Sequence, residues 1–298
     1  MTNQNILSLR YATPKINQIF SETQKIIYER ELWLTVLKSQ KELGLDISDR
    51  DIKKFESAKL DVDLDFIKTL EKKTRHDIKA KIEAYVKAAH APSHIHKGMT
   101  SRDLTDNVEQ MQIKLAAEII YKKYQIILKT LLSKADEYKD INLTARTHHQ
   151  PAQITVLGRR FAMWAEELKI HLDDFKNFIN EIPLRGIKGP VGTQFDMLTL
   201  LGNIEKVEKL EKNVAKKLGF KNVLVASGQV YPRSLDYKLI SILSIIGSTL
   251  ENFAKSMRLM AGYELVTEGF QEGQVGSSAM PHKMNTRSSE RICGFSEL

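Results

Sequence analysis

The sequence predicts an all-α protein, and two features of its 298 residues support that class. Glycine (15 residues) and proline (7 residues) are scarce, and long stretches contain neither. Because both residues interrupt helices, their scarcity favours helices over a sandwich or a barrel. Apolar residues also recur at helical spacing over two long stretches, 104–140 and 233–268. At 1.5 Å per residue the first would be roughly 55 Å long, a length typical of a long-helix bundle.

Shorter helices are predicted for the first hundred residues. An irregular arm covers residues 1 to about 16, and a first amphipathic helix runs over 16–43 and ends at Gly44. Two short helices follow, capped around Ser48 and Asp63. Thr74 is predicted to cap the next helix, with Asp77 in the capping-box position, and that helix ends near residue 90. Residues 1–103 are therefore predicted to form an N-terminal helical domain.

The remaining residues, 104–298, are predicted to form a central long-helix bundle domain. After the first long helix comes a polar loop, and Pro151 is predicted to open the next helix because proline suits a first turn. A glycine-rich link (183–203) and a short charged helix (204–218) come next. The second long helix (233–268), a polar loop (269–287) and a new helix from 288 onward follow.

The helix expected over 233–268 has a middle that is apolar almost all round. Such a helix must be covered on every side. Because few partners are available within this chain, we expect the helix to be buried in the core of a helical oligomer.

Composition narrows the classes of function. The one cysteine, Cys293, permits no disulfide within a chain, which fits a reducing, cytoplasmic setting. Residues 1–10 lack the apolar core of a signal peptide, and the longest apolar-rich run, 239–250, is too short to span a bilayer.

The formal net charge of +8 could indicate nucleic-acid binding. No zinc-finger, RRM or helix-turn-helix pattern accompanies it, however, and the lysines of 204–218 alternate with glutamates as on a solvated helix face. A small polyanionic substrate is the preferred interpretation.

Three histidines lie within seven residues, at His90, His94 and His96. A metal site is one interpretation, but Pro92 disfavours a continuous helix and no thiol or compact carboxylate set accompanies the histidines. Thr100 and Ser101 come next, and they are interpreted first as helix capping and second as ligands for a carboxylate or phosphate.

Other polar strings are candidates for chemistry. Arg10 and Tyr11 could hold a phosphate, and the residues around His76 lie at a predicted helix N-terminus, where anions bind well. His148 lies in the polar loop before Pro151, where Thr147 or Gln150 could fix its tautomer.

The loop 276–285, Gly-Ser-Ser-Ala-Met-Pro-His-Lys-Met-Asn, has the most specific pattern. Ser277 could act as a base, and Lys283 and Asn285 could hold negative charge that develops on a carboxylate. The string closely resembles the signature loop of the fumarase/aspartase superfamily. Two further strings strengthen this resemblance: Thr-Arg-His-Asp at 74–77 and Thr-His-His-Gln-Pro-Ala at 147–152. The three segments together resemble the adenylosuccinate lyase family.

That resemblance implies a carbon–nitrogen lyase of purine biosynthesis that eliminates fumarate from adenylosuccinate, giving AMP, and from SAICAR, giving AICAR. It implies a homotetramer with active sites shared between subunits, and no metal or organic cofactor. Ser277 would be the general base, His148 the general acid and Lys283 the group that stabilises the aci-carboxylate, while Glu290 would orient His148. The implied substrate-binding residues are Arg10, Tyr11, Arg75, His76, Asp77, His96, Thr100, Ser101, Gln194, Asn285 and Arg291.

Two departures from the family pattern keep alternatives open. Asn285 is followed by Thr286 where the family usually has proline, and the chain stops just inside a new helix where family members continue with further helices. C-terminal truncation is therefore expected. The alternatives are another fumarate-releasing lyase of the superfamily, similar to argininosuccinate lyase, and an inactive helical oligomer or fragment.

Overall fold

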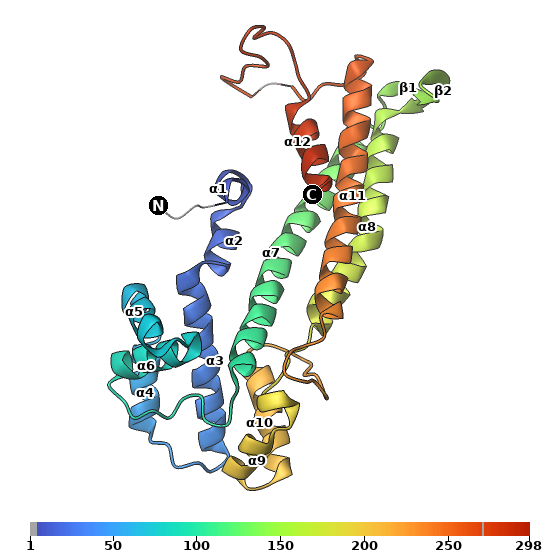
Figure 1. Cartoon of the computed structure of the whole chain (residues 1–298). Coiled ribbons are helices and arrows are strands. Elements are labelled where there is room, and N and C mark those ends of the chain that lie inside the picture. Colours follow the sequence, from blue (N-terminus) through green and yellow to red (C-terminus); the bar gives the residue numbers. More distant parts are fainter. Residues whose placement is uncertain (1–4, 270) are drawn as a thin grey trace. The chain divides into compact units, whose positions relative to one another are not determined.

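The computed structural model describes residues 5–269 and 271–298. In this part the chain is helical apart from one two-stranded sheet, which confirms the predicted all-α, long-helix class (Figure 1). The chain forms two compact units. Unit 1 takes the described residues up to 119 together with 179–232, and unit 2 takes 120–178 with 233–298. The division into domains 1–103 and 104–298 stays a prediction.

Unit 1 is built from short helices around the longer α3, with side-chain caps at several helix starts. Ser21, Ser48, Asp63 and Asn203 each accept a backbone N–H of the first turn of their helix. The caps expected at Ser48 and Asp63 are thus confirmed. The helices are α1 (Ile6–Tyr11), α2 (Pro14–Ile19), α3 (Glu22–Glu42), α4 (Asp49–Ser57), α5 (Leu64–Thr74), α6 (Asp77–Ala89), the start of α7 (Ser101–Glu137), the 3-10 turn η1 (Pro190–Gly192), α9 (Phe195–Leu201) and α10 (Ile204–Lys217).

An aromatic cluster fills the interior of unit 1. Trp33 of α3 stacks with Tyr85 of α6 at a ring-centroid distance of 6.3 Å, and Phe55 of α4 meets the edge of Tyr85 at 5.0 Å. All three are fully or almost fully buried. The Tyr85 hydroxyl donates to the carbonyl oxygen of Phe55, so its polar end is satisfied. These contacts join α3, α4 and α6 into one body.

Unit 2 contains the rest of α7, strands β1 (Asn142–Thr147) and β2 (Gln150–Val156), most of α8 (Leu157–Glu181), α11 (Ser234–Gly262) and α12 (Arg287–Ser296). Trp164 of α8 lies at its centre, with Phe253 of α11 at 4.9 Å and Phe161 at 5.3 Å, both edge to face. Farther along α8, the Phe175 ring packs edge to face with the rings of Tyr121 and Tyr124 of α7. The long helices are therefore packed along an aromatic seam.

The segment after α7 differs from the prediction. Pro151 does not open a helix but lies in β2, opposite Arg146 of β1, and α8 begins only at Leu157. The register of the two strands shifts between Thr144 and Arg146. A bulge accommodates a proline, which has no N–H to give to the ladder. The β-branched run Ile154-Thr155-Val156 favours a strand.

Other boundaries also move. The predicted irregular arm contains α1 and α2, and the predicted helix over 16–43 is broken at Ser21, which caps α3. Thr74 ends α5 instead of capping α6, because its hydroxyl donates back to the carbonyl of Leu70. The second long helix ends at Gly262, six residues before the predicted end at 268.

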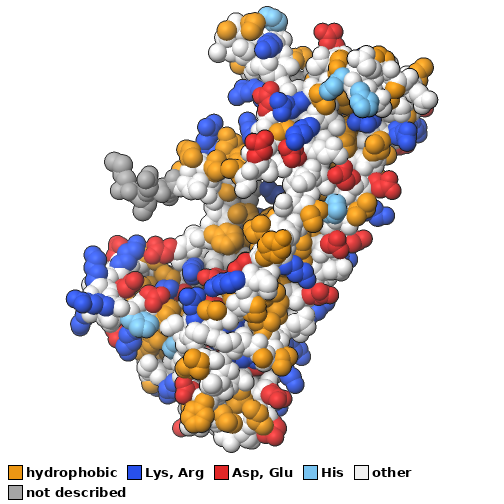
Figure 2. All heavy atoms as spheres, turned by 45° about the vertical axis from the view of Figure 1, so that its right-hand side comes forward, with side chains coloured by type: hydrophobic (Ala, Val, Ile, Leu, Met, Phe, Trp, Pro, Cys, Tyr) orange, Lys and Arg blue, Asp and Glu red, His pale blue; other side chains and the backbone are white. Residues whose placement is uncertain are grey.

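Helix α11 exposes several large apolar side chains. Tyr237 is 76% exposed, Ile240 60% and Leu259 52%. Hydrophobic side chains are also visible among charged ones on the face drawn in Figure 2. No helix in the described residues is long and apolar enough to cross a membrane.

Candidate active site

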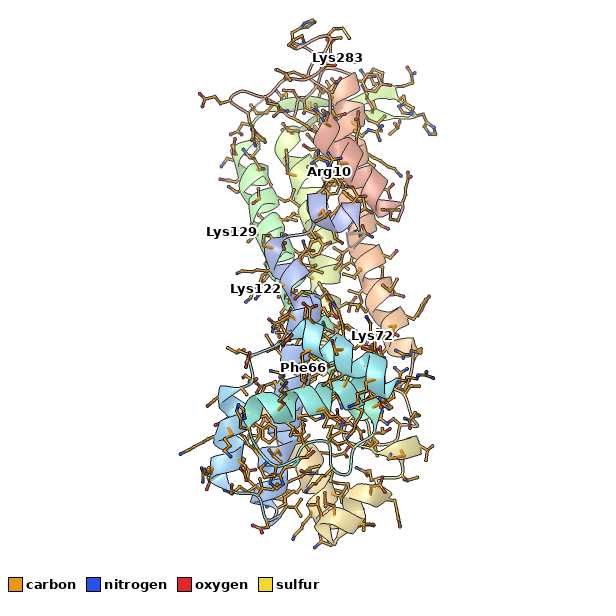
Figure 3. All side chains as sticks on the ribbon, turned by 60° about the vertical axis from the view of Figure 1, so that its left-hand side comes forward. Arg10, Phe66, Lys72, Lys122, Lys129 and Lys283 are labelled. Carbon is orange, nitrogen blue, oxygen red and sulfur yellow. The ribbon has the colours of Figure 1, made fainter. Side chains whose placement is uncertain are left out.

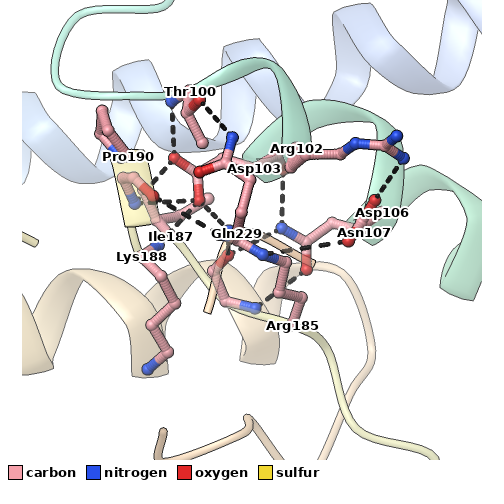
Figure 4. A network of polar contacts seen from close by, with 12 residues as sticks. Thr100, Arg102, Asp103, Asp106, Asn107, Arg185, Ile187, Lys188, Pro190 and Gln229 are labelled. Atoms are coloured by element: carbon pink, nitrogen blue, oxygen red, sulfur yellow. Dashed lines mark hydrogen bonds and ion pairs between the residues drawn. The ribbon is translucent and has the colours of Figure 1, made fainter. Parts of the chain in front are cut away.

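Asp103 holds the polar centre of unit 1 together (Figure 4). Its side chain is fully buried and forms an ion pair with Arg185, which is equally buried. One carboxylate oxygen accepts the N–H groups of Lys188 at 2.8 Å and Gly189 at 3.1 Å, and the other accepts the N–H of Thr100 at 2.8 Å. Burial raises the pKa of Asp103, while these N–H groups and the guanidinium act in the opposite direction. The carboxylate therefore joins the start of α7 to the glycine-rich link.

This joining fixes two of the predicted substrate-binding residues. The Gln194 N–H donates to the carbonyl of Lys188 at 2.7 Å, and its side-chain amide donates to the carbonyl of Ile187 at 3.1 Å. The Thr100 hydroxyl accepts the side-chain amide of Gln229 at 3.1 Å. Both residues thus belong to one hydrogen-bonded group, and Ser101 opens α7 beside Thr100.

A third segment joins the same group. Arg185 donates to the carbonyl of Gly228 at 2.9 Å, and Asp106 accepts the N–H of Tyr231 at 3.0 Å. A Cβ added at Gly192 would lie 1.9 Å from the carbonyl oxygen of Ser227, so only glycine permits this approach. Two N–H groups of the glycine-rich link, those of Lys188 and Gly189, thus serve Asp103.

Asp103 and Arg185 were missed as organising residues in the sequence. Asp103 was visible only as part of a capping pattern, and Arg185 only as a residue of the glycine-rich link. They are 82 residues apart, and nothing local in the sequence pairs them.

The Arg-His-Asp string lies on the surface between α5 and α6. Arg75 has a left-handed backbone (φ 52°) and is the C-cap of α5, and the Nδ1 atom of His76 caps α6 by accepting the N–H of Lys79 at 3.3 Å. Asp77 is the first residue of α6, 3.6 Å from that same nitrogen. All three side chains are exposed. They lie at a helix N-terminus as predicted, and anion binding there stays a prediction.

The three clustered histidines have different surroundings. His90 ends α6 in a left-handed conformation, His94 lies 3.6 Å from Asp51, and His96 accepts a hydrogen bond from Trp33. Burial, together with the nearby His76, lowers the pKa of His96 to about 4. In the described part of the chain no group of three or more His, Cys, Asp or Glu side chains is arranged to hold a metal ion.

Arg10 and Tyr11 are exposed at the end of α1, with the Arg10 guanidinium 5.5 Å from the centre of the Tyr11 ring. Figure 3 labels Arg10 on α1 and, in unit 2, Lys283 in the loop before α12. No hydrogen bond or ion pair among the described residues joins Arg10 to the Asp103 group. Arg10 and Tyr11 thus lie on the surface of unit 1, and their role in substrate binding stays a prediction.

His148 lies at the tip of the β1–β2 hairpin. His148 and His149 both have positive φ (50° and 63°) and form a two-residue turn. Such turns prefer asparagine and glycine, so two histidines here are a strained choice. His148 also lines a cavity of about 290 Å³ with Arg160, Met260 and Tyr263. Thr147 and Gln150 are the residues that could fix the tautomer of His148, but among the described residues neither hydrogen-bonds its ring.

The loop 276–285 is mostly exposed but internally bonded. The Asn285 side-chain amide donates to the carbonyl of Gly276 at 2.9 Å, and the Gly276 N–H donates to the carbonyl of Pro281 at 3.2 Å. The hydroxyl of Ser277 accepts the N–H of Met280 at 3.4 Å. Lys283 projects into solvent. An N–H group directed at the serine oxygen would favour its deprotonated form.

Glu268, which the sequence reading missed, anchors the end of this loop. Its carboxylate accepts the N–H groups of Ser288 and Ser289 and the hydroxyl of Ser289, at 3.2, 2.9 and 2.6 Å. Burial alone would raise the pKa of Glu268, but these hydrogen bonds outweigh it and the net shift is downward. The carboxylate thus satisfies free N–H groups of α12, the helix that carries Glu290 and Arg291.

Glu290 is exposed, and among the described residues no hydrogen bond or ion pair joins it to His148. Within unit 2 likewise, no hydrogen bond joins His148 to Ser277 or Lys283 among the described residues. The structure thus does not bring the catalytic candidates into one hydrogen-bonded group among the described residues, and their roles stay predictions.

Residues 10–297 match the Lyase family (Lyase_1), so this chain belongs to that family of lyases. It is 38% identical to the adenylosuccinate lyase of Schistosoma mansoni over 295 residues, which cover 98% of this chain and 62% of that protein. It is 36% identical to the adenylosuccinate lyase of Methanocaldococcus jannaschii over 299 positions, 98% of this chain and 63% of that protein. The chain thus spans about three fifths of the length of these relatives.

Solved structures agree on the fold. The 3-carboxy-cis,cis-muconate lactonizing enzyme from Pseudomonas putida superposes with a TM-score of 0.81 at 20% identity, covering 99% of this chain and 66% of that one. A fumarate lyase from Mesorhizobium sp. BNC1 gives 0.75 at 18% identity, covering 95% and 62%.

Proposed function

We propose that this chain carries the adenylosuccinate lyase activity, the elimination of fumarate from adenylosuccinate to give AMP and from SAICAR to give AICAR. The observation that carries the proposal is the similarity to adenylosuccinate lyases over 98% of the chain, 276–285 included. The exposed arginine, lysine and histidine side chains described above suit a substrate with one phosphate and two carboxylates.

In the proposed mechanism Ser277 removes the proton from the succinyl carbon. Lys283 and Asn285 stabilise the resulting aci-carboxylate, and His148 protonates the departing nitrogen. The Asn285 amide already closes the loop onto Gly276, so only its second N–H is available for the oxyanion. A serine needs its pKa lowered strongly to act as a base. We therefore propose that the loop closes over the substrate and excludes water.

The remaining roles belong to substrate binding and orientation. We propose that Glu290 orients His148 and that the residues of unit 1, with Arg291, bind the substrate. No metal or organic cofactor is proposed, and a cytoplasmic location fits the single cysteine, Cys293.

A homotetramer with shared active sites is also proposed, supported by the apolar side chains that α11 exposes, such as Tyr237 and Ile240. Light scattering on the purified chain tests it, and a well-folded monomer at micromolar concentration would reject it. Ile240→Glu places a charge on the apolar surface of α11. Lys255→Glu is the matched control, because it introduces the same residue at a position that is already charged. Only Ile240→Glu should reduce the mass.

The test of the activity is cleavage of adenylosuccinate by the purified chain, followed by ultraviolet absorbance, with argininosuccinate and malate as competing substrates. Cleavage of adenylosuccinate that is lost in Ser277→Ala supports the proposal. Cleavage of argininosuccinate alone would favour the other fumarate-releasing lyases, and cleavage of none of the three would favour an inactive helical oligomer.

A further inference from the structure

Trp33 and His96 form a hydrogen-bonded pair that the proposed mechanism does not use. The indole Nε1 of Trp33 lies 3.0 Å from Nδ1 of His96, and the two rings meet edge to face at 5.9 Å. Trp33 is 1% exposed. An indole nitrogen can only donate, and a buried indole N–H requires an acceptor. Nδ1 of His96 must therefore carry a lone pair and not a proton.

The second ring nitrogen then carries the proton. A neutral imidazole has one N–H and one acceptor nitrogen, so with Nδ1 accepting, the proton lies on Nε2. Among the described residues Nε2 of His96 makes no hydrogen bond. It is also absent from the set of fully buried polar atoms without a partner, so it is not fully buried. This N–H group is therefore open to a ligand.

The surroundings hold both rings in place. Trp33 is stacked on Tyr85, and the Arg30 guanidinium lies over the Tyr85 ring, 4.5 Å from its centre. The backbone at His96 is left-handed (φ 67°), and Gln40 donates to the next carbonyl, that of Lys97, at 3.0 Å. The low pKa of His96, about 4, which results first from burial and then from His76, agrees with an uncharged ring at neutral pH.

We propose that Trp33 is a positioning residue that fixes His96 as an uncharged Nε2–H donor for an anionic group of the substrate. This deepens the proposed function and rests on it where the substrate is concerned. His96 then contributes binding and not proton transfer, because the neutral ring would have to release its Nε2 proton as a very weak acid. The proton donor for the departing nitrogen is accordingly sought elsewhere, at His148.

The first experiment concerns the rings alone and needs no substrate. The chain has two tryptophans, so its indole N–H spectrum has two signals, which Trp33→Phe and Trp164→Phe assign. A long-range ¹H–¹⁵N spectrum of the histidines, with His96 assigned by loss of its signals in His96→Gln, reports the tautomer. We expect protonated Nε2 and bare Nδ1 at pH 7, and a slowly exchanging Trp33 indole N–H. A proton on Nδ1, or a doubly protonated ring, overturns the proposal.

The second experiment measures the consequence for the substrate. In Trp33→Phe the ring loses its partner, and we expect KM for adenylosuccinate to rise about three- to tenfold with kcat nearly unchanged, the size expected for one hydrogen bond. Trp164→Phe makes the same substitution at a buried site in unit 2 and should leave KM unchanged. An unchanged KM in Trp33→Phe overturns the proposal.

A further pair of variants separates the two ring nitrogens. His96→Gln places an amide N–H near the position of Nε2, and His96→Asn places one near Nδ1. We expect the glutamine variant to retain more of kcat/KM than the asparagine variant, and the reverse order contradicts the assignment. If the unaltered chain cleaves no adenylosuccinate, the proposed function fails, and the tautomer spectrum still decides the role of Trp33.

Discussion

The Asp103 group and the loop 276–285 hold candidate site residues in opposite ways. Asp103 is fully buried and accepts a backbone N–H from the neighbouring Thr100 and another from the distant Lys188, together with an ion pair to Arg185. The loop is mostly exposed, and its bonds run between its own residues, as from Asn285 to Gly276. A buried, fully bonded carboxylate sets a rigid geometry, whereas an exposed loop with few packing contacts opens at little cost. We therefore expect the groups around Asp103 to keep a fixed geometry, and the loop 276–285 to change its conformation more easily.

The largest expected effect is on turnover, and it comes from changing the proposed proton-transfer residues of unit 2, Ser277 and His148. Ser277→Ala and His148→Ala should each lower kcat by about 10³-fold or more, because each removes a proposed proton-transfer group. His148 is exposed and Ser277 is half-buried, so the thermal midpoint should change little. Ser278→Ala, which removes the neighbouring exposed hydroxyl, is the control and should retain turnover. Near-normal kcat in Ser277→Ala would refute the assignment of the base.

The second prediction concerns the stability that the buried Asp103 carboxylate gives to unit 1. Asp103→Asn should reduce the free energy of unfolding by ~3–5 kcal/mol, because it leaves the Arg185 charge buried without its partner. Urea unfolding followed by circular dichroism measures it. Asp136→Asn removes a carboxylate whose side chain is 80% exposed and pairs with Lys139, and it should cost less than ~1 kcal/mol. Equal losses in the two variants would mean that burial does not distinguish the two carboxylates.

The third prediction uses pH to test burial in unit 1. The pKa of His96 is about 4 in the folded chain and 6.5 ordinarily. Between these values the unfolded chain binds a proton that the folded chain does not, so stability falls as pH falls from 6.5 towards 4. The loss should be ~1–3 kcal/mol. Urea midpoints measured across this range should fall more steeply for the unaltered chain than for His96→Gln. Parallel curves would show that His96 is not buried as an uncharged ring.

The smallest effect sharpens the description of the loop. Glu268→Ala should cost ~1 kcal/mol, the usual value of a helix cap, and should speed amide exchange at Ser288 and Ser289. Glu272→Ala changes an exposed glutamate of the same segment that caps nothing in the described chain, and exchange there should be unaffected. Unchanged protection of Ser289 in Glu268→Ala would show that α12 is anchored by packing and not by this carboxylate.

Local patterns predicted much of the fold because they depend on neighbours in the chain. The helix over 101–137, the caps at Ser48 and Asp63 and the end of α3 near Gly44 follow from spacing, cap residues and glycine. The hairpin around His148 was missed, since proline suits both a helix start and a strand bulge. His76 as a cap was missed because Thr74 is the more usual capping residue.

What the sequence by itself determined is the helical class, the long helices and the identity of the candidate groups, above all the string 276–285 whose pattern is local. Only the tertiary structure decided which distant residues meet. Asp103 with Arg185 and Trp33 with His96 are separated by 82 and 63 residues. No local preference encodes such pairs, because each forms only when packing removes water and leaves a buried donor or charge that must find its partner.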